Sequence, residues 1–151
     1  MSYFDQNLFF ASSALARSMS NLADKAFKNM EITPTQGFTL IAINELNIHG
    51  TSDIAKELYL QPSTITRFVD KLENLGYVKR KYKGRKVEIY LTKQGLEKEK
   101  EALKCLNILN DLTLDVLPEA EKAEAVKGIF KLNNLFTKYY AKERLKKQKN
   151  K

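Results

Sequence analysis

The spacing of apolar residues changes from a helical to a strand period between residues 51 and 95, and this change constrains the fold most. Pro62 suits the first residue of a helix, because its φ is fixed and its missing N–H would have no intrahelical partner. One apolar stripe follows, formed by Ile65, Phe68, Val69, Leu72 and Leu75. Strand-like runs at residues 77–82 and 85–91 then flank Lys83-Gly84, whose glycine suits a hairpin turn. We therefore predict two short helices followed by a two-stranded β-wing.

The polar face of the helix that starts at Pro62 is rich in hydroxyl groups. It carries Ser63, Thr64, Thr66 and Arg67. Arginine can bond O6 and N7 of guanine together, whereas serine and threonine adapt to several base edges and threonine adds a methyl contact with thymine. We expect these four side chains to contact bases in a DNA major groove. A solvated helix face is the alternative interpretation.

The predicted hairpin is strongly basic. Six of the eight residues 79–86 are Lys or Arg, interrupted only by Tyr82 and Gly84. Each basic side chain that neutralises a phosphate releases condensed counterions, so DNA binding by such a hairpin should weaken steeply as salt rises. The residues expected to contact the DNA backbone, from the wing and both helices, are Thr51, Ser52, Gln61, Lys71, Lys81, Lys83, Arg85 and Lys86.

These motifs resemble the multiple-antibiotic-resistance regulator (MarR) family of bacterial winged-helix transcription factors, and the resemblance extends over nearly the whole chain. It rests on Asp53-Ile54-Ala55 with Leu58, on residues 63–73, on Leu75-Gly76-Tyr77-Val78 and on the return from Leu91-Thr92 to Gly95. It implies a homodimer with one recognition helix per subunit in successive major grooves and the wing against the backbone or minor groove. The wing is shorter than usual, and only Arg85 matches the family's acidic and double-arginine signature, which leaves minor-groove insertion open.

Outside the wing the sequence predicts helices. Thr33-Pro34-Thr35-Gln36 matches a capping box for a helix that should end near residues 47–50, Thr92 is a candidate N-cap for a helix over residues 93–114, and Pro118 should open the last helix. The expected fold is mainly α with a small β-hairpin wing: a winged helix-turn-helix domain plus N- and C-terminal dimerisation helices. We expect a single domain, residues 1–151, with a DNA-binding lobe at 33–92 and a helical dimerisation region at 3–30 and 93–145.

The first and last helices carry long apolar stripes. A small winged helix has little interior for so many apolar and aromatic side chains, so we expect them to contact a second copy of the chain. The predicted interface residues are Phe4, Leu8, Phe9, Leu15, Val126, Phe130, Phe136 and Tyr140. Packing in the core of a monomer is the alternative. Two recognition helices related by a twofold axis would require an inverted-repeat DNA site with half-sites about one helical turn apart.

The charge balance indicates a polyanionic partner. The formal net charge is +8 and the pI is near 9.5, which suits nucleic acid or an acidic membrane surface. The last fourteen residues hold seven basic and one acidic side chain, and this tail either adds non-specific DNA attraction or is a solubilising terminus. The sequence has no convincing signal peptide and no apolar run approaching the ~20 residues of a membrane span, so we expect a cytoplasmic protein with no membrane partner.

The residue inventory argues against an enzyme. The chain has one His, one Cys and no Trp, and it lacks a glycine-rich phosphate loop. We expect His49 to be an exposed loop imidazole and Cys105 a buried structural thiol, with no metal and no cofactor. The predicted function is a sequence-specific, double-stranded DNA-binding transcriptional regulator, a homodimeric repressor of a pseudo-palindromic operator. The alternative is a winged-helix module for protein or RNA contact, but Ser63, Thr66 and Arg67 are polar and only Tyr82 offers a stacking aromatic.

The family resemblance also implies a small aromatic effector, bound between the dimerisation helices and the winged helix. Phe9, Phe10 and Phe38 are apolar enough to line such a pocket. Core packing is the stronger interpretation of these three residues, so the sequence assigns no pocket.

Overall fold

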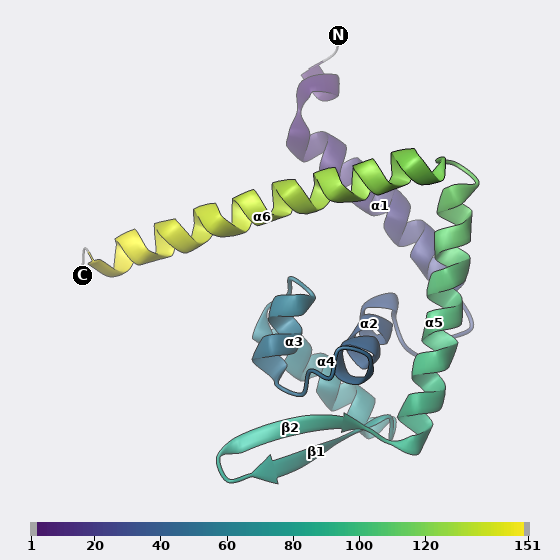
Figure 1. Ribbon diagram of the computed structural model, residues 1–151, viewed down its shortest axis with the longest axis vertical. Helices are drawn as coiled ribbons and strands as arrows, with labels where there is room; N and C mark the ends of the chain where they lie inside the picture. Colours follow the sequence, from purple (N-terminus) through teal and green to yellow (C-terminus); the bar gives the residue numbers. More distant parts are fainter. Residues whose placement is uncertain (1–2, 150–151) are drawn as a thin grey trace. The chain divides into compact units, whose positions relative to one another are not determined.

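The computed structural model describes residues 3–149, with side chains described at residue 4 and at residues 6–143. A short 3-10 helix at Tyr3–Gln6 comes first. The other elements, in chain order, are α1 (Leu8–Ala26), α2 (Pro34–Asn44), α3 (Thr51–Glu57), α4 (Pro62–Asn74), β1 (Val78–Lys83), β2 (Lys86–Leu91), α5 (Lys93–Leu114) and α6 (Glu119–Lys149) (Figure 1). The predicted fold class is confirmed: the chain is mainly helical and has one antiparallel hairpin. Contacts divide it into a unit that ends at Asn110 and a unit that begins at Asp111.

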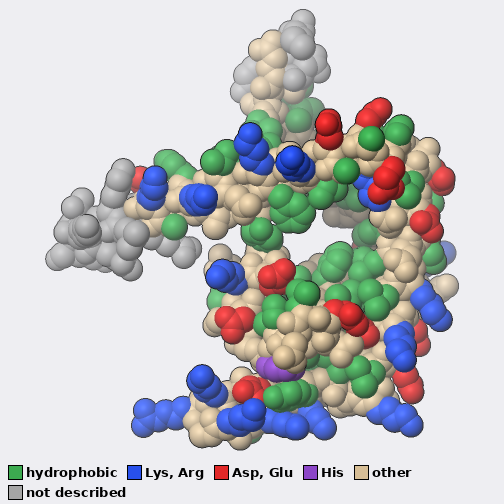
Figure 2. All heavy atoms as spheres, viewed as in Figure 1, with side chains coloured by type: hydrophobic (Ala, Val, Ile, Leu, Met, Phe, Trp, Pro, Cys, Tyr) green, Lys and Arg blue, Asp and Glu red, His purple; other side chains and the backbone are tan. Residues whose placement is uncertain are grey.

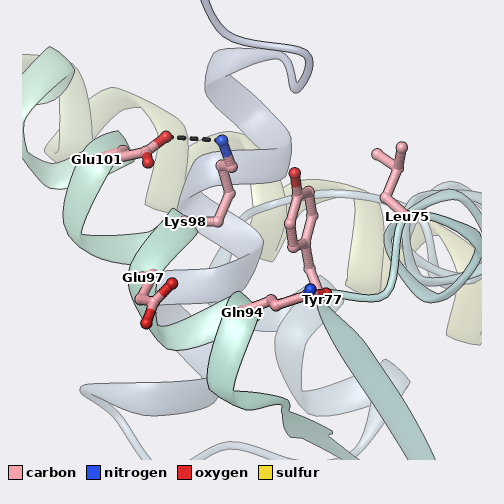
Figure 3. Close-up of a pocket in the computed structure, with 6 residues that line it drawn as sticks. All are labelled: Leu75, Tyr77, Gln94, Glu97, Lys98 and Glu101. Carbon is pink, nitrogen blue, oxygen red and sulfur yellow. Dashed lines mark hydrogen bonds and ion pairs between the residues drawn. The ribbon is translucent and has the colours of Figure 1, made fainter.

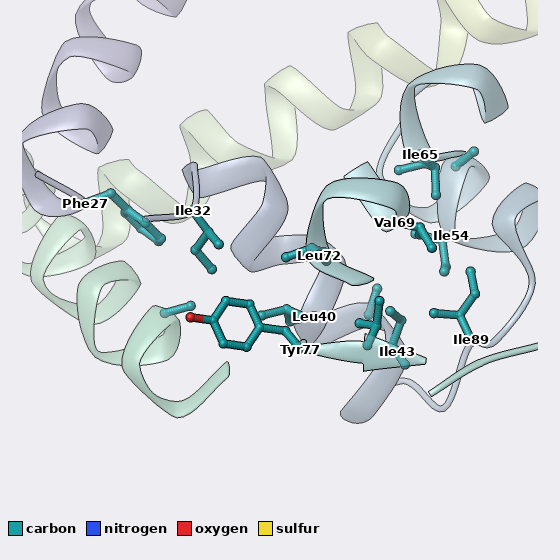
Figure 4. Packing of buried hydrophobic residues seen from close by; sticks show 14 residues of the cluster. Phe27, Ile32, Leu40, Ile43, Ile54, Ile65, Val69, Leu72, Tyr77 and Ile89 are labelled. Carbon is teal, nitrogen blue, oxygen red and sulfur yellow. The ribbon is translucent and has the colours of Figure 1, made fainter. Parts of the chain in front are cut away.

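The core of the first unit lies between α2, α3, α4 and the hairpin (Figures 1 and 4). The predicted apolar stripe of α4 supplies Ile65, Val69 and Leu72, each fully buried, while Phe68 and Leu75 pack at the edge. The remaining buried apolar residues are Phe27, Ile32, Leu40, Ala42, Ile43, Ile54, Ala55, Tyr77, Val78, Ile89 and Ala102. The inner face of α4 is therefore fixed by packing, and its outer face is left for other contacts.

The capping box predicted at the start of α2 is present. The Thr33 hydroxyl accepts from the Gln36 N–H at 3.4 Å, and the Gln36 side chain accepts from the Thr33 N–H at 3.0 Å. However, α2 ends at Asn44, earlier than the predicted 47–50. The chain reverses through Asn47, which takes a left-handed φ of 54°, and the Ile48 N–H bonds back to the Ala42 carbonyl. Asparagine tolerates this backbone conformation better than most residues.

The hairpin turn lies one residue later than predicted. The strands pair antiparallel from Val78 opposite Leu91 to Lys83 opposite Lys86, so the two turn residues are Gly84 and Arg85. Gly84 has φ 60°, as the first residue of a type II′ turn requires. The glycine therefore belongs at the first turn position, and Lys83 is the last residue of β1.

Thr92 joins the base of the hairpin to α5. Its hydroxyl accepts from the Gly95 N–H at 3.0 Å, as predicted for an N-cap, and lies 2.6 Å from the Gly76 carbonyl oxygen. Its N–H donates to the Tyr77 carbonyl at 3.0 Å. A Cβ at Gly95 would lie only 1.8 Å from that same carbonyl oxygen, so only glycine fits where α5 meets the hairpin.

The predicted dimerisation helices expose their apolar side chains. No residue of α1 is buried. All eight predicted interface residues are exposed, namely Phe4, Leu8, Phe9, Leu15, Val126, Phe130, Phe136 and Tyr140. Ala26 at the end of α1 packs against the core, whereas these eight side chains are exposed on the single chain.

Candidate nucleic-acid interface

The outer face of α4 presents the four predicted base-contacting residues. Ser63, Thr66 and Arg67 are exposed, and Thr64 is half-buried. Within the described part of the chain, Arg67 makes no hydrogen bond or ion pair, so its guanidinium is available for a bidentate contact with guanine. Arg67 is held in place by packing on the opposite face of the same helix.

Thr66 has a narrower role than its sequence position suggests. Its hydroxyl donates to the Pro62 carbonyl oxygen at 3.0 Å, one helical turn earlier. The hydroxyl hydrogen is therefore used within the helix. What remains for a base is an acceptor lone pair and the methyl group, which suits the thymine methyl.

The starts of α3 and α4 lack side-chain caps. Gly50 is the N-cap of α3 and Gln61 that of α4, and neither N-cap makes a side-chain capping hydrogen bond. Thr51 is the half-buried first residue of α3 rather than its cap, and Ser52 is exposed beside it. Unsatisfied N–H groups and the helix dipole favour an anion at the start of α4. Gln61 is exposed there, and Lys71 is exposed on the last turn of α4.

The wing has two chemically different faces. Strand alternation and the register place Lys79, Lys81, Lys83 and Lys86 on one face together with Glu88 and Tyr90, and we call these six residues the lysine face. The other face buries Val78 and Ile89 against the helices, and its tip exposes Tyr82. Figure 2 shows basic side chains gathered over the wing. Of the predicted backbone contacts, Lys81, Lys83 and Lys86 share the lysine face and Arg85 is exposed in the turn.

Arg80 ties β1 to α4. Its guanidinium bonds Asp70 at 2.5 Å and also bonds Glu73, and its backbone N–H donates to Glu73 at 3.2 Å. Burial lowers the pKa of Arg80, but hydrogen bonding to Asp70 and the charges of both carboxylates outweigh it and raise the pKa above its ordinary value. Arg80 therefore braces the wing against α4 and is not free for phosphate. The sequence signal for this contact was the pair of acidic residues Asp70 and Glu73, which lie one helical turn apart on α4.

His49 is not the exposed loop imidazole expected from the sequence. It is half-buried, with its ring stacked on Tyr90 at 4.2 Å between centroids. One ring nitrogen lies 2.9 Å from the Ile89 carbonyl oxygen and the other lies 2.9 Å from the Asn47 side-chain oxygen. The burial of His49 results from tertiary packing, because the chain after α2 runs beside β2 and hydrogen-bonds to it. His49 thus supports the ring on which the Lys81 ammonium sits, 4.6 Å from the Tyr90 centroid.

A separate pocket of about 320 Å³ lies where the hairpin meets α5 (Figure 3). It is lined by Leu75, Tyr77, Gln94, Glu97, Lys98 and Glu101. Its only cation, Lys98, is paired with Glu101 at 2.6 Å. None of the three phenylalanines considered for an effector pocket lines it, since Phe9, Phe10 and Phe38 are all exposed elsewhere.

Comparison with known proteins finds one family whose model resembles this segment. Residues 32–83 match the family model described as the MarR family. The winged-helix segment of this chain is similar to MarR-family domains. The resemblance inferred from the sequence is thus confirmed, and the MarR match covers α2, α3, α4 and β1, which carry the predicted base-contacting residues.

Several solved structures share the fold across most of the chain. The PcaV transcriptional regulator of Streptomyces coelicolor, solved with its natural ligand, is 19% identical with a TM-score of 0.78, covering 89% of this chain and 96% of its own. BpsR of Bordetella bronchiseptica, described as regulated in DNA binding by 6-hydroxynicotinic acid, is 17% identical with a TM-score of 0.79, covering 87% and 98%. MepR of S. aureus, solved as a DNA complex, is 20% identical with a TM-score of 0.74, covering 86% and 98%.

No curated protein sequence matches the chain significantly. Within residues 3–149, no helix is both long and apolar enough to cross a membrane. Among the described side chains, no three His, Cys, Asp or Glu residues come together in a group that could hold a metal ion.

Proposed function

We propose that this chain is a sequence-specific, double-stranded DNA-binding transcriptional regulator, which acts in the cytoplasm as a homodimeric repressor of a pseudo-palindromic operator. One observation carries the proposal: Arg67 is exposed on α4 and its side chain has no hydrogen bond or ion pair among the described residues, while the opposite face of that helix is buried in the core. A rigid helix with a free guanidinium among hydroxyls is suited to base contact. The MarR match and the fold shared with the MepR–DNA complex support it.

The proposed division of labour assigns residues 33–92 to DNA and residues 3–30 and 93–145 to dimerisation. Arg67, Ser63, Thr64 and Thr66 would contact bases, and the uncapped helix starts and the wing would contact the backbone. The exposed apolar stripes of α1 and α6 would pair two copies, which sets the spacing of the two recognition helices. BpsR and PcaV are described with ligands, so we also propose that a small aromatic molecule regulates DNA binding here.

The decisive experiment compares Arg67→Ala with Lys86→Ala. A duplex is first selected from a random pool, and the affinity for this duplex and for a scrambled one is measured across a range of salt. Arg67→Ala should cost about 1–3 kcal/mol on the selected duplex and relax preference at one base position. Lys86→Ala should weaken both duplexes alike and reduce the salt slope by about 1. Equal losses on both duplexes for both variants would contradict the assignment.

A winged-helix module for RNA or protein contact is the competing function. Tyr82 is exposed at the wing tip and could stack on an unpaired base. Competition between the selected duplex and a single-stranded or hairpin RNA of equal length separates the two. Displacement of the duplex by equimolar RNA would favour the alternative.

A further inference from the structure

Glu88 is the only acidic residue of the wing, residues 78–91, and it lies among the four lysines of the lysine face. Its carboxylate pairs with the Lys83 ammonium at 2.7 Å. The same oxygen, Oε2, accepts from the Tyr90 hydroxyl at 2.5 Å. Two donors therefore hold this carboxylate oxygen beside a lysine expected to contact phosphate.

The surroundings keep Tyr90 in place. Its ring is stacked on His49, which has an oxygen atom 2.9 Å from each ring nitrogen, and Lys81 lies over the same ring. A tyrosine fixed in this way aims its hydroxyl at one position. The bond from Lys83, and then the bond from Tyr90, lower the pKa of Glu88, so the carboxylate stays charged where DNA would bind.

We propose that Glu88 limits the affinity of the wing for DNA by competing with phosphate for Lys83, and that Tyr90 is the positioning residue that holds Glu88 there. The inference rests on the proposed function, since it concerns how strongly the wing binds the DNA backbone. It assigns a role to β2, which the matched family segment does not reach.

The competition is electrostatic rather than steric. Lysine has three N–H donors, so Lys83 can still meet a phosphate while it is paired with Glu88. However, a phosphate that binds there also approaches the carboxylate, and like charges repel. The Lys83 and Glu88 pair together carries no net charge and displaces less of the counterion atmosphere than Lys83 alone. Exposed ion pairs are weak, so the expected effect on affinity is about two- to fivefold.

The test measures affinity for a scrambled duplex from 50 to 200 mM salt, where base preference plays no part. Glu88→Gln should bind about two- to fivefold more tightly at the low-salt end, with a slope of log affinity against log salt steeper by about 0.9. A slope steeper by this amount corresponds to about 3.5-fold between 50 and 200 mM salt, so the advantage of Glu88→Gln should be largely lost at the high-salt end. Tyr90→Phe keeps the ring but loses the bond to Glu88, so it should shift affinity and slope in the same direction by less.

Two comparisons separate competition from a general change in charge. Glu97→Gln removes the same charge from an exposed site on α5, outside the wing, and should leave the slope unchanged. Lys83→Ala should lose more affinity in the Glu88→Gln background than in the wild type, because only there is the lysine fully available. Glu88→Thr, with a good strand former, repeats the removal of the carboxylate if the glutamine variant unfolds.

An unchanged slope in both Glu88 variants, or equal losses for Lys83→Ala in both backgrounds, would overturn the proposal. These results are distinguishable from failure of the proposed function. If no duplex selected from a random pool is preferred over the scrambled one, sequence-specific regulation fails, yet the role of Glu88 in the grip on the backbone can still hold. A wild-type chain that binds neither duplex overturns both.

Discussion

At the scale of single residues, Glu99 of α5 is unusual because its carboxylate is buried. It is only 2% exposed, and its Oε1 has no hydrogen-bond partner. The groups that face it are Asn44 and Glu45 at the C-terminal end of α2, together with Lys100 of its own helix. Burial raises the pKa of Glu99, Glu45 raises it further, and Asn44 and Lys100 oppose them. The negative end of the α2 dipole adds to the cost of a second carboxylate there.

We expect Glu99→Gln to make folding stability less dependent on pH. The pKa of Glu99 is raised in the folded state, so its protonated form favours folding, and that contribution is complete at acid pH. It is lost as pH rises above the ordinary value of 4.5 and through the folded pKa. Thermal midpoints between pH 4 and pH 9 should therefore fall with pH in the wild type, and less so in the variant. Glu97→Gln, exposed on the same helix, is the control, and equal pH slopes in wild type and Glu99→Gln would contradict the expectation.

At the scale of elements, the contact that relates the wing to the recognition helix is Arg80 with Asp70 and Glu73. This tie sets the angle at which the lysine face and the outer face of α4 would meet one duplex. Geometry of this kind matters for affinity, because the two surfaces must reach their contacts together. The wing is therefore braced against α4.

Arg80→Met should loosen this brace while keeping much of the apolar stem. Because Asp70 and Glu73 are partly exposed, with 54% and 36% of their side chains accessible, we expect a loss of only about 1 kcal/mol in the free energy of unfolding. Specific affinity should fall more than non-specific affinity, because α4 and the wing no longer act from a fixed angle. Lys79→Met, next to Arg80 on the opposite face of β1, is the matched control for urea unfolding and DNA titration. Similar losses in both variants would argue against a brace.

Local signals in the sequence were enough to predict most elements. Pro62 begins α4, Thr92 caps α5, and the apolar stripe of α4 is the buried one. Each of these depends on residues within one or two helical turns, so local chemistry determines it. The hairpin turn was misplaced by one residue. The end of α2 was placed too late, because a left-handed residue such as Asn47 gives a weaker signal than a capping box.

The details of the site could not be read in the same way. Arg80 lies ten residues from Asp70 in sequence, and His49 lies forty residues from Ile89, so their pairing depends on how the elements pack. The contacts of Glu88 with Lys83 and Tyr90 depend instead on the register of the hairpin, which the sequence placed one residue away from its true position. Sequence patterns identified which surface should bind DNA, but they did not distinguish the basic side chains that are free from those that are paired.

At the scale of the whole molecule, we expect the exposed apolar stripes of α1 and α6 to pair two copies of the chain. Contiguous exposed apolar surface on a soluble protein often marks an interface. We expect sedimentation to show a dimer at micromolar concentration. A variant with both Phe9→Ser and Phe130→Ser, which are 80% and 49% exposed, should shift it toward monomer. The matched control is Tyr82→Ser, which removes an exposed aromatic from the wing tip and should leave the dimer intact. A wild-type monomer under these conditions would contradict the predicted dimer.

The close packing around Thr92 has a consequence for engineering. The base of the hairpin is held by the hydroxyl and N–H of Thr92 and by the close approach of Gly95 to Tyr77. None of these contacts involves the distal half of the hairpin. Residues 82–87 can therefore be exchanged for a hairpin tip of another length or charge while the stems stay clasped. Such exchanges would give a series of variants that differ only in the hairpin tip. The length of double helix that the wing contacts could then be varied on one scaffold.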